Sequence, residues 1–278
     1  MSAPTFLICP PDHFTVEYEI NPYMSLEGGT VDRDAAHEQW SRFRDALREA
    51  GAEVIEQKPI AGLPDLVFTA NAGFVCNGRV LLSRFLHKER QGETPHDAEL
   101  FAGIGLETEE LPTDAGYFEG TGDAILFGSR VFCGYGRRTS ESALSHVERF
   151  AGVPLVPIHL VDDRFYHLDL VIAPLDEGER ALVVPSALDD ESRERVKRVI
   201  PEPILLTDEE ALAFCANSVV VNGSILMNRV PDRVGKLLEE NGLTPVEVPV
   251  PEFLKAGGSL RCLSLRLDAH APTDSPVT

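Results

Sequence analysis

Apolar and polar positions along this chain form short runs that recur with a period of roughly 45 to 50 residues. Each copy shows two β-rich runs joined by a tight turn, then an amphipathic helix, then a third β-rich run. Four copies follow one another, and their paired strands are expected in 73–84, 122–136, 168–186 and 217–230. The pattern predicts an α/β fold built from ββαβ units.

Turn and cap residues mark the ends of these predicted elements. The pairs Asn77-Gly78 and Asn222-Gly223 each separate two β-rich runs, as a two-residue hairpin requires. Pro231 is placed to open one helix, because proline suits the first helical turn. Thr94 is predicted to cap another helix.

The two ends of the chain carry the parts of a fifth unit. The N-terminal part offers strands in 5–11 and 52–57, and the C-terminal strand in 262–267 has no partner nearby in sequence. The helix between the first two has one apolar face, formed by Ala36, Trp40, Phe43, Leu47 and Ala50. Joining the ends predicts a five-fold pseudosymmetric α/β propeller closed by strands from both termini, and one domain over 1–278.

Composition narrows the possible partners. The chain has 278 residues, is 43% hydrophobic and carries a formal net charge of −20, which fits a globular protein and not a binder of nucleic acid or anionic membranes. No apolar run is long enough for a membrane span, and the N-terminus lacks the features of a signal peptide. We therefore expect a cytoplasmic protein without a nucleic-acid or membrane partner.

The five cysteines are widely spaced and form no C-x-x-C pair. This argues against a disulfide framework and against a zinc cluster, so most should be ordinary buried thiols. His167 and Asp169 form an H-x-D pair that could bind a metal, but no second cluster at ligand spacing supports one. We expect neither a metal nor an organic cofactor.

Three short stretches carry candidate functional side chains, and each also has an ordinary structural interpretation. "GLPDLVFTANAG" contains Asp65, Phe68 and Asn71, of which the polar pair could simply be turn and cap residues. "GYFEGTGDAI" places Glu119 in a glycine-flanked turn, where it could be a loop carboxylate. In "RFYHLDLVI" the pair at 167 and 169 would face one side of a predicted strand, although a histidine there is often a hydrogen-bonded core residue.

Cys262 changes the weight of these stretches. A lone thiol is usually inert, but Cys262, His167 and Glu119 all lie near strand ends in different units, where a ring would bring them together. A nucleophile, a proton shuttle and an orienting carboxylate are the requirements of covalent catalysis. Gly257 and Gly258 precede the thiol and would let the backbone bend toward a substrate.

The surplus of carboxylates points to a cationic ligand. Asp65, Glu119 and Asp169 would crowd one small pocket with negative charge, which is unfavourable without a cation among them. A planar guanidinium can share its donors among several carboxylates, and its resonance-stabilised carbon calls for a soft nucleophile such as a thiolate.

Together these residues resemble the guanidine-modifying superfamily, the penteins, and most closely the arginine dihydrolase domain that heads a longer bifunctional protein in cyanobacteria. The resemblance covers nearly the whole chain and rests on the following stretches in family order: "CPPDHFTVEYEINPYM", "PDLVFTANAG", "LSRFLHKERQGE", E-G-x-x-D at Glu119, "RFYHLD" and "EFLKAGGSLRCLSLR". It implies a pentein fold and hydrolysis at the guanidinium carbon of arginine, without a cofactor.

The resemblance also implies roles for individual residues. Cys262 would be the nucleophile and His167 the general acid and base. Glu119 and Asp169 would contact the guanidinium, with Asp65 and Phe68 close by. Three more residues would bind the substrate, Arg90 and Arg138 at its α-carboxylate and Asn21 from the N-terminal loop.

Two positions separate the relatives within the superfamily. Asp169 favours unmodified arginine over methylated arginine, and Asn71 stands where arginine deiminases carry aspartate, which favours a dihydrolase. Dimethylargininase and arginine deiminase, both ending at citrulline, remain alternatives. A non-catalytic binding protein of the same fold is a remote one, and a homo-oligomer is possible.

Overall fold

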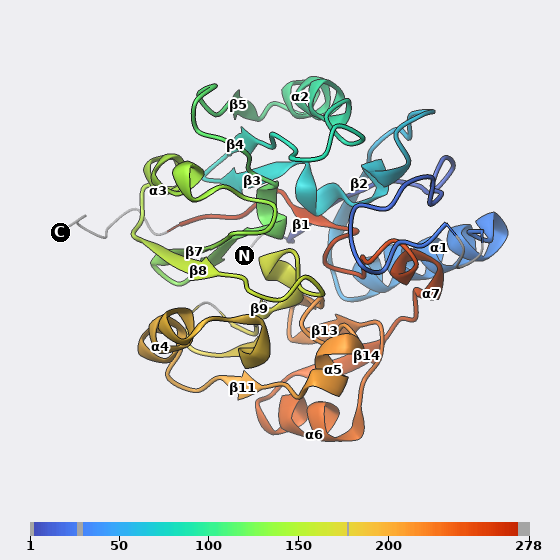
Figure 1. Cartoon of the computed structure of the whole chain (residues 1–278). Helices are drawn as coiled ribbons and strands as arrows, with labels where there is room; N and C mark the ends of the chain where they lie inside the picture. Colours follow the sequence, from blue (N-terminus) through green and yellow to red (C-terminus); the bar gives the residue numbers. More distant parts are fainter. Residues whose placement is uncertain (1–2, 27–29, 177, 272–278) are drawn as a thin grey trace.

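The computed structural model describes residues 3–26, 30–176 and 178–271, and Figure 1 shows its units following one another around the molecule. The first unit in sequence order after the N-terminal part contains β3 (Gly73–Cys76), β4 (Arg79–Leu82), α2 (Glu93–Gly103) and β5 (Glu107–Glu109). The second contains β6 (Ala124–Phe127), β7 (Arg130–Tyr135), α3 (Leu144–Ala151) and β8 (Leu155–His159). The third contains β9 (Ile172–Pro174), β10 (Ala181–Val183), α4 (Asp190–Val199) and β11 (Ile204–Leu205).

The fourth and fifth units complete the set. The fourth contains β12 (Val219–Val221), β13 (Ser224–Met227), α6 (Asp232–Glu240) and β14 (Thr244–Glu247). The fifth combines β1 (Thr5–Ile8), α1 (Arg33–Glu49), β2 (Glu53–Glu56) and β15 (Leu265–Arg266). Two short helices, α5 (Asp208–Leu212) and α7 (Pro251–Leu254), connect units.

Each unit forms its own three-stranded sheet with one pattern of pairing. The middle strand is antiparallel to one neighbour and parallel to the other, for example in β3-β4-β5 and in β12-β13-β14. The predicted pairing of the chain ends is confirmed, because β1 pairs antiparallel with β15 and parallel with β2. The five sheets are separate, so among the described residues no single closed sheet is formed.

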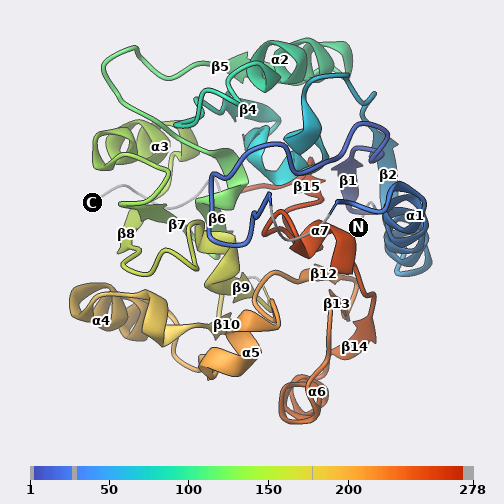
Figure 2. The ribbon, with the colours of Figure 1, turned by 45° about the vertical axis from the view of Figure 1, so that its right-hand side comes forward.

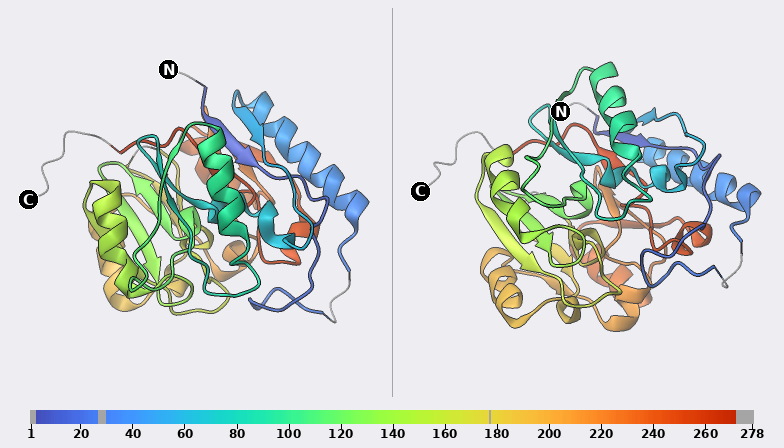
Figure 3. Two further views of the ribbon diagram at one scale, coloured as in Figure 1. Left: turned by 90° about the horizontal axis from the view of Figure 1, so that it is seen from above. Right: turned by 45° about the horizontal axis from the view of Figure 1, so that its top comes forward.

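The main helices lie on the periphery of the molecule and the sheets face inward (Figure 2). Helix α1 shows why: its buried residues Ala36, Trp40, Phe43 and Leu47 form one stripe toward the core. In the view from above, β1 lies near one face of the molecule, and the blue segment that follows it runs to the opposite face (Figure 3, left).

Local predictions of turns and caps are partly confirmed. Asn77 and Asn222 have positive φ of 53° and 48°, as tight hairpins require. The predicted cap at Thr94 is wrong, because α2 already begins at Glu93 and the Thr94 hydroxyl donates a hydrogen bond to the Ser83 carbonyl at 2.9 Å.

A short turn precedes the first strand of four units and β15 of the fifth. Three of these turns are 3-10 helices: η2 (Thr69–Asn71) before β3, η3 (Gly120–Gly122) before β6 and η5 (Leu168–Leu170) before β9. A bend at Asn217 precedes β12, and the turn at 259–263 precedes β15. These five turns carry most of the candidate functional residues.

Candidate active site

Hydrogen bonds connect the five turns to one another. Asn71 Nδ2 donates to the Glu119 carbonyl at 3.1 Å, and Asn217 Nδ2 donates to the Asp169 carbonyl at 3.2 Å. The turn of Cys262 is tied back to the first unit, because the Ala70 amide donates to the Cys262 carbonyl at 3.1 Å. Residues far apart in sequence therefore meet at one place.

Two sequence-based placements need correction. His167 and Asp169 are not on a strand, because Asp169 lies in the 3-10 helix η5 and His167 directly precedes it. Cys262 is likewise in a turn, and the strand begins only at Leu265. The convergence survives the changed secondary structure, because both turns lie where the units meet.

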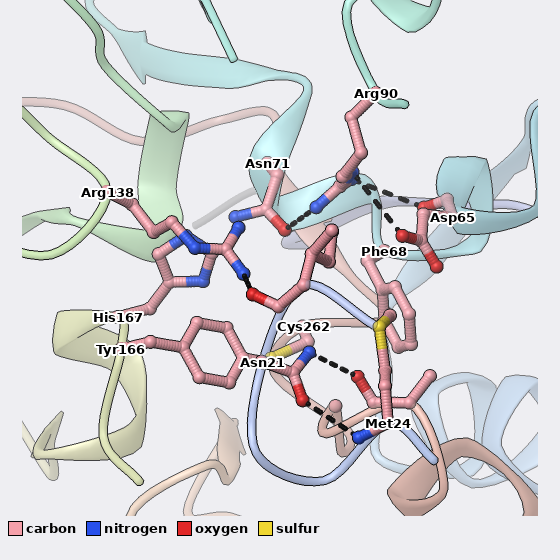
Figure 4. Close-up of a pocket in the computed structure, with 13 residues that line it drawn as sticks. Asn21, Met24, Asp65, Phe68, Asn71, Arg90, Arg138, Tyr166, His167 and Cys262 are labelled. Atoms are coloured by element: carbon pink, nitrogen blue, oxygen red, sulfur yellow. Dashed lines mark hydrogen bonds and ion pairs between the residues drawn. The ribbon is translucent and has the colours of Figure 1, made fainter. Parts of the chain in front are cut away.

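A small pocket lies where these turns meet (Figure 4). Eight of the ten predicted site residues line it: Asn21, Asp65, Phe68, Asn71, Arg90, Arg138, His167 and Cys262. Glu119 and Asp169 lie directly behind the wall, hydrogen-bonded to His167 and Cys262. The free space is only about 10 Å³, close to the volume needed for one water molecule.

His167 and Glu119 form a fully buried pair. His167 Nε2 lies 2.8 Å from Glu119 Oε2, and Arg138 Nη1 donates to the same oxygen at 3.0 Å. Burial alone would raise the pKa of Glu119, but Arg138 and then His167 outweigh it and hold the pKa below its usual range. Since Glu119 is ionised, Nε2 of His167 must donate, which leaves Nδ1 as the nitrogen able to accept a proton.

Cys262 lies beside a second buried carboxylate. Its Sγ is 3.3 Å from Asp169 Oδ2 and 3.1 Å from Asn217 Nδ2. Burial, followed by the Asp169 carboxylate, raises the pKa of the Cys262 thiol well above its usual range. Burial also raises the pKa of Asp169 to about 6, with Arg261 only partly opposing the shift. In the empty pocket the sulfur is therefore a thiol that donates to Asp169.

Asp65 is the third buried carboxylate at the pocket. Tyr18 donates to its Oδ2 at 3.0 Å, while Arg90 Nε is 3.9 Å away. Burial raises the pKa of Asp65, although Arg90 opposes the shift. Oδ1 of Asp65 and Oδ1 of Asp169 are both buried without a hydrogen-bond partner among the described residues.

The two arginines of the pocket differ in how many of their donors are occupied. Arg90 binds Glu93 through Nε and Nη2 at 2.9 and 2.8 Å, and its Nη1 donates to Asn71 Oδ1 at 2.9 Å. Arg138 donates to Glu119 and, through Nη2, to the Ile20 carbonyl at 2.7 Å. More donors of Arg138 than of Arg90 are thus left for a ligand.

Residues of the N-terminal loop cover the pocket. Asn21 Nδ2 donates to the Ala256 carbonyl at 3.0 Å, and Asn21 Oδ1 accepts from the amides of Tyr23 and Met24 at 3.0 and 3.2 Å. Residues 27–29 lie outside the described part. Because the pocket is nearly filled, an arginine can enter only if side chains or the loop move.

The two glycines before Cys262 each occupy a position that a side chain would disturb. Gly257 has φ of +80°, which favours glycine. A Cβ on Gly258 would lie 2.2 Å from the ring of Phe68, so any side chain there would displace the pocket wall.

Several site residues were missed in the sequence. Tyr18, Glu93 and Tyr166 support Asp65, Arg90 and Arg138, the last through a ring 4.8 Å below the guanidinium. Asn217 was also missed, although comparison of the repeats contains the signal: it precedes an Asn-Gly hairpin in the fourth unit as Asn71 does in the first.

Comparison with known proteins adds the family. The sequence profile of eukaryotic N,N-dimethylarginine dimethylhydrolases matches residues 10–267. The chain belongs to this family. A relative within it, the N(G),N(G)-dimethylarginine dimethylaminohydrolase of Mycobacterium tuberculosis, is 34% identical over 94% of this chain and 85% of its own length.

Similar proteins also include arginine dihydrolases. The bifunctional arginine dihydrolase/ornithine cyclodeaminase AgrE of Nostoc sp. is 43% identical over 94% of this chain, which spans 37% of that protein's length. The solved N-terminal domain of ArgZ, a cyanobacterial arginine dihydrolase in a mutant bound to substrate, superposes with a TM-score of 0.92 at 40% identity, covering 97% of this chain and all of that one.

Two further findings concern metal sites and membrane-spanning helices. Across the described ranges, no cluster of three or more His, Cys, Asp or Glu residues is arranged to hold a metal ion. None of the described helices has both the length and the apolar character to span a bilayer.

Proposed function

We propose that this chain is a cysteine-dependent hydrolase acting on the guanidinium carbon of arginine, and that it works as an arginine dihydrolase. The observation that carries the proposal is the buried pocket in which Cys262 and His167 meet beside three carboxylates. The similarity to AgrE and to the ArgZ domain supports the choice of substrate. One domain over 1–278, closed as a five-unit propeller through the linked turns, would be the catalytic unit.

The electrostatics of the empty pocket support a cationic substrate. Asp65 and Asp169 each have a buried oxygen without a hydrogen-bond partner in the described part of the chain, and burial raises the pKa of both carboxyl groups. A guanidinium would supply N–H donors to these oxygens and the missing positive charge. The same charge next to Sγ would favour the thiolate over the thiol.

The reaction then follows from the positions of the side chains. The Cys262 proton leaves, through Asp169 or His167, and the thiolate forms a C–S bond with the guanidinium carbon. His167 protonates the departing ammonia. Glu119 holds the His167 imidazole in place while its charge changes. Water, activated by the same histidine, breaks the C–S bond and gives citrulline. A second attack on the retained ureido group would give ornithine, carbon dioxide and a second ammonia.

Asn71 supports the second round. It lines the pocket as a neutral amide held by Arg90 and the Glu119 carbonyl. An aspartate here would repel the ureido oxygen, whereas the amide does not. Arg138, with more free donors than Arg90, would bind the substrate α-carboxylate from the other wall, with Phe68 and Asn21 closing the site.

Dimethylargininase is the second candidate, favoured by the family profile and by the Mycobacterium tuberculosis relative. Product analysis separates the two. Ornithine with two ammonia per arginine is expected from purified protein. Citrulline from arginine as the final product, or faster release of dimethylamine from dimethylarginine, would contradict the dihydrolase proposal.

A further inference from the structure

Asn217 is fully buried and lies between the nucleophile and its neighbouring carboxylate. It follows α5, in a turn whose first residue, Phe214, has φ of +62°. Positive φ is rare for a bulky residue, and such conformations persist where the surrounding structure requires them. The Asn217 amide donates to the Phe214 carbonyl at 3.0 Å, so this unusual turn sets the position of Asn217.

The side-chain amide of Asn217 makes four contacts, and these fix its orientation. Oδ1 accepts from the backbone amides of Ser259 and Cys262, each at 3.2 Å. Nδ2 donates to the Asp169 carbonyl at 3.2 Å and to Cys262 Sγ at 3.1 Å. If the amide were flipped, its NH₂ group would face the backbone N–H groups of Ser259 and Cys262, and donors would oppose donors. The nitrogen must therefore face the sulfur.

The sulfur thus has two polar neighbours with opposite preferences. When Asp169 is ionised, its Oδ2, at 3.3 Å, can only accept, so it favours the protonated thiol. Asn217 Nδ2 can only donate, so it favours the thiolate. When the thiolate forms, Asp169 remains a hydrogen-bond partner only where it has taken the proton. The Asn217 contact strengthens in either case, because a hydrogen bond to an ion is stronger than one to a neutral group.

Asn71 occupies in the first unit the position that Asn217 occupies in the fourth. Each asparagine lies two residues before the first strand of its unit, and each donates Nδ2 to a main-chain carbonyl in a neighbouring turn. Of the two asparagines, only Asn217 also donates its Nδ2 to the candidate nucleophile, Cys262 Sγ.

We propose that Asn217 is the positioning residue of Cys262: it ties the 259–262 turn to the fourth unit and donates an N–H to the thiolate, both before attack and when the C–S bond breaks. The proposal rests on the proposed function for its catalytic meaning. Each hydrolytic step expels the thiolate, so a dihydrolase would use the donor twice per arginine.

The variant Asn217→Asp tests this with almost no change in shape. Its carboxylate still accepts from Ser259 and Cys262, but it presents an oxygen to the sulfur. We expect the pH midpoint of Cys262 alkylation by iodoacetamide, followed by mass spectrometry at that cysteine, to rise by about one unit or more. With arginine as substrate, kcat should fall roughly 10²- to 10³-fold, as for loss of one donor to a reacting anion, with little change in KM.

Asn228→Asp is the matched control. Asn228 lies just after β13, where its Oδ1 accepts from the Val250 amide at 2.9 Å, and it does not line the pocket. This variant should alkylate and turn over like the wild type. A wild-type alkylation profile in Asn217→Asp would overturn the proposal.

The alkylation needs no substrate, so it stays informative even if arginine proves not to be the substrate. If Asn217→Asp does not fold, the wild type decides. The side-chain ¹⁵N–H resonances of Asn217 should then shift with the same pH midpoint as Cys262 alkylation, and resonances unaffected by thiolate formation would contradict the proposal.

Discussion

The two sides of the pocket carry equally buried carboxylates in opposite electrostatic states. On the histidine side, Glu119 is surrounded by Arg138 and His167, and its pKa is held below the usual range. On the cysteine side, burial raises the pKa of Asp169 to about 6, and one of its oxygens has no hydrogen-bond partner among the residues that the structure describes. The histidine side is neutralised by the protein itself. On the cysteine side Arg261 opposes the effect of burial only partly, and this difference indicates where the substrate's charge belongs.

Cys262→Ser should have the largest effect, because it removes the reacting atom of the cysteine side and leaves the charges of both sides unchanged. Turnover of arginine should fall by about 10⁴-fold or more. Arginine should still bind, which calorimetry can measure. The control Cys76→Ser changes a buried thiol in β3, outside the pocket, and should stay active. Substantial turnover by Cys262→Ser would refute covalent catalysis at this thiol.

Glu119→Gln should have the next largest effect, since it removes the charge of the histidine side. The imidazole loses the partner that fixes its tautomer, and Arg138 loses its counter-ion. We expect kcat to fall roughly 10²- to 10⁴-fold, with a smaller change in arginine affinity. Steady-state kinetics measure this effect. The control is Glu109→Gln, which changes an exposed carboxylate at the end of β5. An unchanged kcat would mean that Glu119 does not orient the base.

Asp169→Asn should act mainly on binding. A charge-assisted hydrogen bond is worth about 1.5 to 3 kcal/mol, so arginine affinity should fall roughly 10- to 100-fold. In the free protein the same change should move Cys262 alkylation to lower pH, because the carboxylate contributes to the raised pKa of the thiol. Unchanged affinity for arginine would place the substrate's charge elsewhere.

The repeating units were readable from the sequence because periodicity and turn residues are local signals. Five strand–helix units and the pairing of β1 with β15 follow from apolar runs and from an unpaired final strand. The cap at Thr94 failed for a local reason: a threonine at the second position of a helix offers the same signal whether or not it is the cap.

The candidate residues were predicted better than their surroundings. Eight of ten line one pocket, yet His167 and Cys262 lie in turns and not on strands. Composition favours strands in both stretches, whereas the structure has the 3-10 helix η5 after His167 and a turn at Cys262. Asn217 was missed because its importance depends on a sulfur 45 positions away, and no local pattern announces such a contact.

The smallest expected effect is a pH dependence of stability that has opposite sign on the two sides. Glu119 has a folded pKa below its unfolded value, so it contributes stability at neutral pH that is lost as the pH falls below the usual range of glutamate. Asp169 has a folded pKa of about 6 against a usual 3.8, so the unfolding free energy should fall as the pH rises from about 4 to 6.

Urea unfolding of Cys262→Ser and of Cys262→Ser/Asp169→Asn, between pH 4 and 7, isolates the cysteine side, because other groups contribute equally to both. The difference in unfolding free energy should change by about 2 kcal/mol across this range. Saturating arginine should abolish the change, since its guanidinium adds to the partial compensation that Arg261 gives Asp169. If the two variants instead gave parallel curves, or arginine left the difference intact, Asp169 would not be the uncompensated charge that distinguishes the two sides of the pocket.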